Sequence, residues 1–157
     1  MNNKKFSFSN LFEVVSVPLF IYLLYIIIME GFDIELKFLD YSIYFRILGF
    51  LITVFVFGFS GYNAAKLDKL KVKPWFAGLI VGFIGSVVSL GISIVIFYYF
   101  PQEIMNSIVD SGVEIVIDDK MKSFMTNMMW IGGIISIVLK SGFGALFGFI
   151  GGSIGKK

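Results

Sequence analysis

The chain has 157 residues, of which 57% are hydrophobic and 15% charged, and its mean hydropathy is +0.89. Soluble domains are closer to half apolar and a quarter charged, so this composition indicates an integral membrane protein. The net charge is only +2, and the sequence contains neither cysteine nor histidine. Disulfides, classical zinc sites and histidine-activated nucleophiles are therefore excluded for this chain alone, and we expect no catalytic residues, no cofactor and no metal.

Four apolar segments predict transmembrane helices, because each approaches the roughly 20 apolar residues that a bilayer span requires. They cover about residues 11–29, 43–63, 75–100 and 129–155. The third contains no charged residue and is the clearest. We therefore predict one integral membrane domain over residues 1–157, all-α, with four transmembrane helices.

The first predicted span follows Lys4 and Lys5, as the apolar core of a signal peptide would. Its apolar run is longer than is typical of a signal, and the small-x-small cleavage pattern is missing. We predict an uncleaved membrane anchor.

The first connection, residues 30–42, alternates apolar and charged side chains from Phe32 to Phe38. Strict alternation is typical of a strand with one buried face. The third connection, residues 101–128, contains the β-branched run GVEIVIDD. Two interpretations stay open, a small pair of strands over the bundle or two amphipathic segments on the membrane surface.

The middle connection, residues 64–74, is basic. Basic residues close to the ends of spans stay in the cytoplasm, so this connection and the lysine-bearing tails predict that both termini are cytoplasmic. Near anionic lipid each lysine can contribute about 1 kcal/mol of attraction, although setting the topology is the simpler interpretation. This inner basic loop carries Lys66, Lys69, Lys71 and Lys73.

The third connection forms a small acidic extracytoplasmic segment in this topology. Asp118 or Asp119 predicts an N-cap for the helix that leads into the fourth span. These two carboxylates, with Asp110 and Glu114, can be combined into a divalent-cation site, but the D-x-[DN]-x-[DN]-G calcium spacing is missing. A solvated acidic surface is the simpler interpretation.

The stretch GFSGYNAAKLDKLKVKPWFAGLIVGFIG resembles a pattern in small prokaryotic four-helix membrane proteins of unknown function. In those proteins a glycine-aromatic-alanine-lysine span end leads through a short basic turn into a G-x-x-x-G helix. The resemblance covers about residues 49–95, and it implies a four-helix fold with both termini inside and no assigned activity. The matching positions are Gly61, Tyr62, Ala64, Ala65, Lys66, Trp75, Gly78 and Gly82.

Small residues recur at a spacing of four in the last two predicted spans. Such residues let membrane helices approach closely, so they predict helix packing. Packing within the four-helix bundle is the simpler interpretation, and a homo-oligomer sealed by the fourth span is the alternative. The predicted packing residues are Gly78, Gly82, Gly144, Gly148 and Gly152.

Lys140 lies in the middle of the fourth predicted span, about 15 Å beyond Trp130 at the helical rise. A lysine there costs about 2.5–3.5 kcal/mol on insertion scales, and such residues usually face a bundle interior or a wet cavity. Ser136 and Gly144 flank it at a spacing of four, so we expect it to face other helices.

Candidate partners of Lys140 include two serines of the third span and two acids at the outer end of the first span. The serines give a candidate intramembrane polar site of Lys140, Ser136, Ser86 and Ser89, and the acids are Glu30 and Asp33. Three interpretations stay open. Lys140 is an anchor that reaches outward, or it lines a cavity for an anion, proton or lipid headgroup, or residues 128–139 and 141–155 are two re-entrant pieces around it.

We expect a non-enzymatic protein with a structural or accessory role, which crosses a prokaryotic cell membrane several times. Its expected partners are the lipid bilayer and either a second copy or another membrane protein, and not nucleic acid. The alternative is a small transporter or pore-forming protein with a polar cavity at Lys140. An enzyme is disfavoured because the predicted spans contain no paired carboxylates.

Overall fold

The computed structural model describes residues 8–36, 42–67, 72–99 and 118–156. The described part of the chain is helical, with α1 (Phe8–Leu36), α2 (Ser42–Lys66), α3 (Pro74–Tyr99) and α5 (Asp119–Gly155). All four helices are long and apolar enough to cross a membrane. The predicted all-helical fold with four candidate spans is therefore confirmed at this level.

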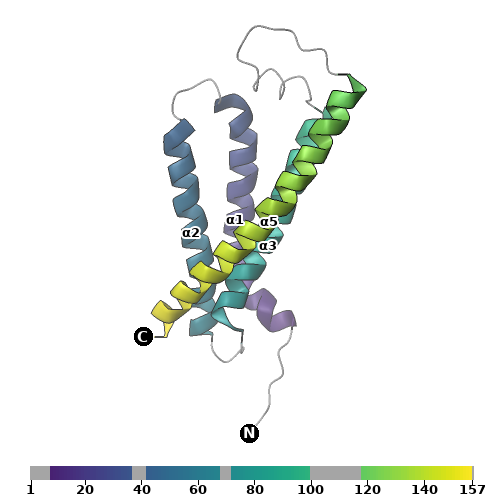
Figure 1. Cartoon of the computed structure of the whole chain (residues 1–157). Helices are drawn as coiled ribbons and strands as arrows, with labels where there is room; N and C mark the ends of the chain where they lie inside the picture. Colours follow the sequence, from purple (N-terminus) through teal and green to yellow (C-terminus); the bar gives the residue numbers. More distant parts are fainter. Residues whose placement is uncertain (1–7, 37–41, 68–71, 100–117, 157) are drawn as a thin grey trace.

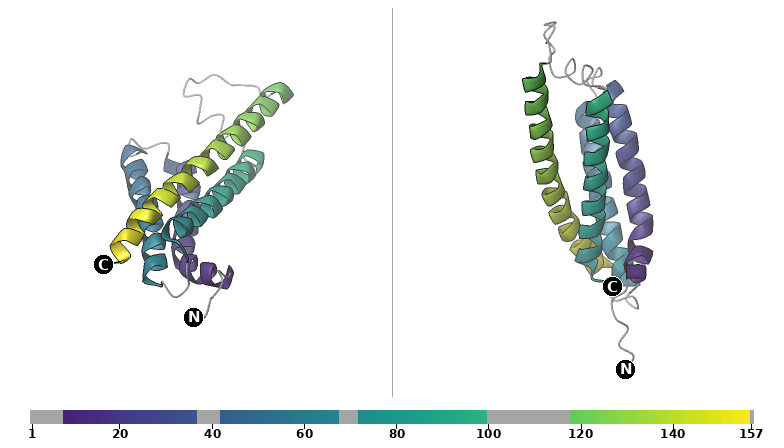
Figure 2. Two further views of the ribbon diagram at one scale, coloured as in Figure 1. Left: turned by 60° about the horizontal axis from the view of Figure 1, so that its bottom comes forward. Right: turned by 90° about the vertical axis from the view of Figure 1, so that its right-hand side faces the viewer.

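The helices alternate in direction, so that α1 begins and α5 ends at the same end of the bundle (Figure 1). We call this end the terminal end, and we call the end at which α3 finishes and α5 begins the loop end. Helix α5 lies diagonally across α2 and α3, and it makes its largest interface with α3. In Figure 2, α5 is close to its neighbours at the terminal end and separates from α3 toward the loop end.

The strand predicted from Phe32 onward is wrong where the structure describes it, because α1 continues to Leu36. A helix that already exists gains one hydrogen bond for each residue it adds, whereas a short alternating run must find a partner strand. Residues 37–41 and 100–117 lie outside the described part, and with them most of the second predicted strand.

Helix α5 is continuous through Lys140, Ser141 and Gly142. The re-entrant interpretation of the fourth segment is therefore wrong. The helix begins at Asp119, ten residues before the predicted start of the span at residue 129. Its 37 residues extend about 55 Å, which exceeds the roughly 30 Å hydrocarbon core of a bilayer.

The predicted N-cap of this helix is present. Asp118 has an extended backbone conformation, and its Oδ1 accepts a hydrogen bond of 2.7 Å from the backbone N–H of Met121. This bond satisfies one of the free N–H groups of the first turn, and the carboxylate also complements the positive end of the helix dipole. The cap explains why the helix can start among polar residues.

The core of the bundle lies between α1, α2 and α3. Tyr22 is fully buried and meets Phe57 of α2 edge to face, with 5.2 Å between ring centroids. Val14, Val56 and Val81 are buried beside them. The three helices therefore share one apolar core, and α5 is added along one side.

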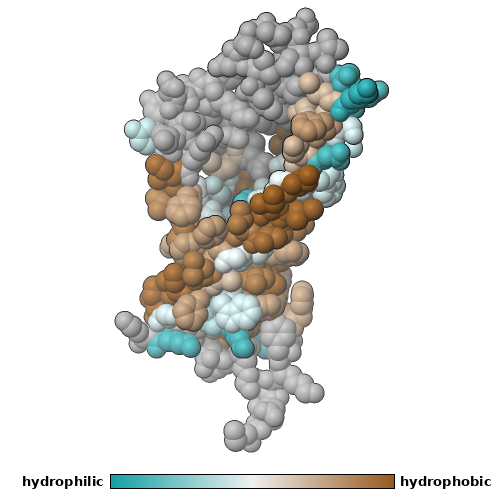
Figure 3. All heavy atoms as spheres, in the orientation of Figure 1, coloured by the Kyte–Doolittle hydropathy of each residue, from teal (hydrophilic) through white to brown (hydrophobic). Residues whose placement is uncertain are grey.

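Large apolar side chains cover much of the outer surface. Figure 3 shows a hydrophobic zone along the helices, with hydrophilic residues at the two ends of the described part. Phe20, Phe55 and Val138 are each about two-thirds exposed, at 65%, 66% and 66%. Soluble monomers rarely expose apolar patches above a few hundred Å², so this surface is suited to lipid.

Candidate functional site

The helix contact nearest the terminal end is built from glycine backbones. A methyl group added at Gly78 of α3 would overlap the carbonyl oxygen of Gly144 of α5, and one added at Gly144 would overlap the carbonyl of Gly78. Gly82 packs in the same way on the backbone of Lys140, where an added Cβ would lie 2.5 Å from the carbonyl oxygen. Only glycine permits backbones to approach so closely.

The same part of α5 also packs against α2. An added Cβ at Gly151 would overlap the carbonyl of Gly58, and one at Gly61 would overlap the carbonyl of Gly148. Gly152 meets the side chain of Pro74 at the start of α3. The terminal half of α5 therefore lies in a groove between α2 and α3, and we call this set of contacts the glycine seam.

All five predicted packing glycines lie in the glycine seam and are buried. The partners on α2 are less apparent in the sequence, because Gly58 and Gly61 are three residues apart. They fit because α5 crosses α2 at an angle. The crossing depends on the tertiary arrangement and not on any spacing within one helix.

Toward the loop end, a cavity of about 190 Å³ lies between α3 and α5. Ser86, Ser89 and Ser93 line it from α3, and Ser136 lines it from α5. Ser86 is buried and the other three serines are half-buried. We call this space the serine cavity, and it contains three of the four residues of the predicted intramembrane polar site.

The hydroxyl groups of α3 are partly occupied by their own helix. Ser86 Oγ donates a hydrogen bond of 2.6 Å to the carbonyl of Gly82, and Ser93 Oγ donates one of 3.0 Å to the carbonyl of Ser89. A donating hydroxyl keeps its lone pairs, so both oxygens can still accept hydrogen bonds. The cavity can therefore hold water or another hydrogen-bond donor, because hydroxyl oxygens line it and its volume exceeds that of several water molecules.

Lys140 lies on α5 next to the serine cavity, one turn from Ser136 toward the terminal end. Its side chain is half-buried, and it interacts with other groups of the protein. It is not among the residues that line the cavity. Helical side chains lean toward the N-terminus of their helix, which for α5 is the direction of Ser136 and the cavity. Along α5, Lys140 thus lies between the glycine seam and the serine cavity.

A second polar group inside the bundle was not predicted. Thr53 of α2 donates a hydrogen bond of 2.8 Å to the carbonyl of Gly49, and its side chain also bonds with Tyr22 and Tyr25 of α1. A methyl group at Gly49 would overlap the Tyr25 hydroxyl. The signal in the sequence is two tyrosines inside a span, away from the interfaces where tyrosine is enriched. This group joins α1 to α2.

The predicted basic and acidic loops are described only in part. The Lys66 ammonium lies over the Tyr62 ring, 5.6 Å from its centroid, and Lys73 is exposed. Lys69 and Lys71 lie outside the described residues, as do Asp110 and Glu114. Within the described residues, no cluster of three acidic groups is placed to hold a metal ion.

No protein-family model, no curated protein and no solved structure matches the chain. The resemblance of residues 49–95 to small four-helix membrane proteins therefore stays a prediction.

Proposed function

We propose that this protein is a non-enzymatic membrane protein with an accessory role, which assembles with a second copy or with another membrane protein. The support is the loop-end half of α5, which leaves the bundle while keeping an apolar surface. Ile131, Ile134, Ile135 and Val138 are each more than half exposed. A long helix that leans away from its own bundle offers a partner helix a continuous apolar side.

Open glycines on α5 and α3 support close approach of such a helix. Among the described residues, no atom lies within 4 Å of the position that a Cβ would take at Gly132, Gly142 or Gly91. The buried glycines of the seam all meet backbone or side-chain atoms within that distance. Small residues favour helix association in membranes, so these open positions fit an intermolecular contact.

Site-specific photo-crosslinking in intact membranes tests this proposal. A photoreactive residue at Ile135 should give protein adducts, and a matched one at Phe20, which is exposed on α1, should give lipid adducts only. The chain has no cysteine, so Ile135→Cys can then separate self-association, which gives a disulfide dimer, from a foreign partner. Lipid adducts alone at Ile135 would contradict the proposal.

A second candidate function is a small transporter or pore-forming protein, and the serine cavity beside Lys140 favours it. The Lys140 ammonium and a serine hydroxyl that turns its O–H into the cavity can both donate to a small anion accompanied by water. Liposomes with the purified protein should then leak chloride faster than empty liposomes. Lys140→Leu should abolish the leak and Lys140→Arg should keep it, with Lys122→Leu as the control. Equal leak in all of them would exclude this function.

For the topology we propose a prokaryotic cell membrane with the terminal end in the cytoplasm. The support is the charge of that end, where Lys66, Lys73 and Lys156 are exposed, and basic residues near spans stay inside. A reporter enzyme that works only in the cytoplasm should be active when it is fused after residue 157. Activity of a reporter that works only outside the cytoplasm, fused at the same place, would overturn this orientation.

A further inference from the structure

An apolar groove runs between α2 and α5 near the terminal end, on the outer surface of the bundle. Its volume is about 310 Å³. The backbones of Gly58 and Gly151 meet at its floor, and the lack of side chains there creates the hollow. Phe55 and Phe59 of α2 form one wall, with stacked rings 6.0 Å apart, and Ile150 belongs to the α5 wall.

The length of the groove matches one leaflet of a bilayer. On α2 it is lined from Val54 to Tyr62, which is about 12 Å at the helical rise. Half of a hydrocarbon core is about 15 Å thick. The groove opens onto the exposed apolar surface, where Phe55 and Ile154 are mostly exposed. A single acyl chain fits this space in both length and chemistry.

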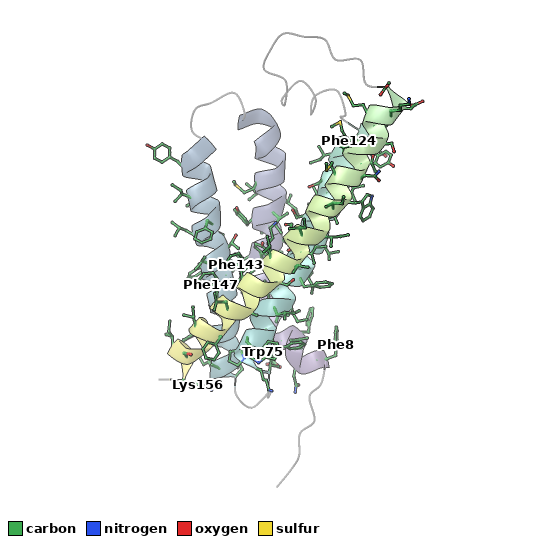
Figure 4. The ribbon with its side chains drawn as sticks, in the orientation of Figure 1. Phe8, Trp75, Phe124, Phe143, Phe147 and Lys156 are labelled. Atoms are coloured by element: carbon green, nitrogen blue, oxygen red, sulfur yellow. The ribbon has the colours of Figure 1, made fainter. Side chains whose placement is uncertain are left out.

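The terminal end of the groove is cationic. Tyr62 closes it there, and the Lys66 ammonium lies 5.6 Å from the centroid of its ring. Gly155 packs on Tyr62 from α5, and the exposed Lys156 follows directly. Figure 4 shows Lys156 at this end of α5, below Phe147, whose side chain lines the groove. The two ammonium charges exceed the partial negative charges of the two helix C-termini.

We propose that this groove binds one anionic phospholipid, with an acyl chain on the Gly58–Gly151 floor and its phosphate held by Lys66 and Lys156. An apolar channel of leaflet length that ends in two cations has the layout of a lipid with a negative headgroup. A zwitterionic lipid fills the channel equally well, but it gains less from the lysines. The proposal requires that the protein lies in a membrane, and it is independent of the accessory and transport roles.

Native mass spectrometry of the full-length protein tests the site. The protein is released from nanodiscs that contain equal amounts of phosphatidylglycerol and phosphatidylcholine with identical chains. We expect one retained phosphatidylglycerol per chain, in clear preference to phosphatidylcholine. Lys66→Gln and Lys156→Gln should each reduce this preference about fivefold, the effect of about 1 kcal/mol per lysine near a membrane surface. Lys122→Gln, at the loop end, is the charge control.

A second pair of variants tests the apolar channel without changing any charge. Ile150→Trp places an indole in the groove and should abolish lipid retention, whereas Phe149→Trp, one residue earlier and outside the lining, should not. Equal retention of both lipids by all variants would show ordinary boundary lipid and overturn the proposal. Displacement of the lipid by millimolar inorganic phosphate would also overturn it, because the site would then recognise phosphate alone. So would a lipid-free dimer that Ile150→Trp dissociates, because a second copy would then occupy the groove.

Discussion

The two halves of the α3–α5 interface differ in the small residues that α3 contributes to them. Near the terminal end, Gly78 and Gly82 allow the backbones to touch, while toward the loop end Ser86, Ser89 and Ser93 line a cavity and Gly133 of α5 meets the side chain of Leu90. The spacing along α3 is nearly the same in both halves. Glycine on α3 therefore accompanies a backbone contact with α5, and serine accompanies a cavity.

The two halves of the interface are also stabilised in different ways. The glycine seam gains dispersion contacts and loses them sharply when any atom is added, because packed interiors do not deform easily. The serine half contains free space, and the hydroxyl groups of Ser86 and Ser93 bond to carbonyls of their own helix. We therefore expect substitutions to be costly in the seam and mild in the cavity.

The largest effect is expected from Gly148→Leu. Gly148 meets α2 and α3 at once, and a side chain there would overlap the carbonyl of Pro74 and the backbone of Gly78. Overpacking typically costs 1–3 kcal/mol, and with backbone on two sides we expect about 3 kcal/mol or more, measured by thermal or denaturant unfolding in detergent. Gly142→Leu, whose Cβ position is open, is the matched control. Equal stability of the two variants would show that the seam does not hold α5.

A smaller effect is expected from Asp118→Ala at the loop end of α5. The substitution removes the hydrogen bond to the N–H of Met121 and should cost about 1 kcal/mol. The loss should be confined to the first turns of α5, because this half of the helix is weakly packed. Hydrogen exchange of residues 119–123 should accelerate, while exchange in the glycine seam stays unchanged. Faster exchange in the seam would mean that both halves unfold together.

The smallest effect is expected from Ser136→Leu, which fills the serine cavity with an apolar side chain. The cavity of about 190 Å³ has room for it, so the unfolding free energy should change by less than about 1 kcal/mol. Gly82→Leu provides the comparison from the seam, with a loss of stability comparable to that of Gly148→Leu. A large loss for Ser136→Leu would show that the cavity is filled and not open.

Particular residues show how far the sequence predicts this structure. Apolar run lengths predict four helices, and Asp118 predicts the cap of α5, because both depend on local chemistry. Hydropathy alone ends α1 too early and starts the fourth span later than the helix that contains it. Polar residues such as Lys120 and Lys122 belong to the helix, and charge alternation after Phe32 does not break one. Helix ends depend on competing local hydrogen bonds, which hydropathy does not measure.

Within the candidate site, the sequence indicates Ser86, Ser89 and Ser136 as neighbours of Lys140, and the structure lines one cavity with all three serines. It does not indicate the bond of Thr53 with two tyrosines, or the partners of α5 glycines on α2. These contacts join residues far apart in the chain. Their formation depends on the angle at which one helix crosses another, and that angle has no signature within a single span.

Four long apolar helices with glycines and serines in rows follow from the sequence alone, since run length and residue type act locally. The contacts that those rows make depend on how the helices pack. The diagonal crossing of α5 brings glycine onto glycine near one end and leaves serine facing serine across a gap near the other. It also opens an apolar groove beside α2. The reason is geometric, because two straight helices that cross at an angle can be in backbone contact over only part of their length.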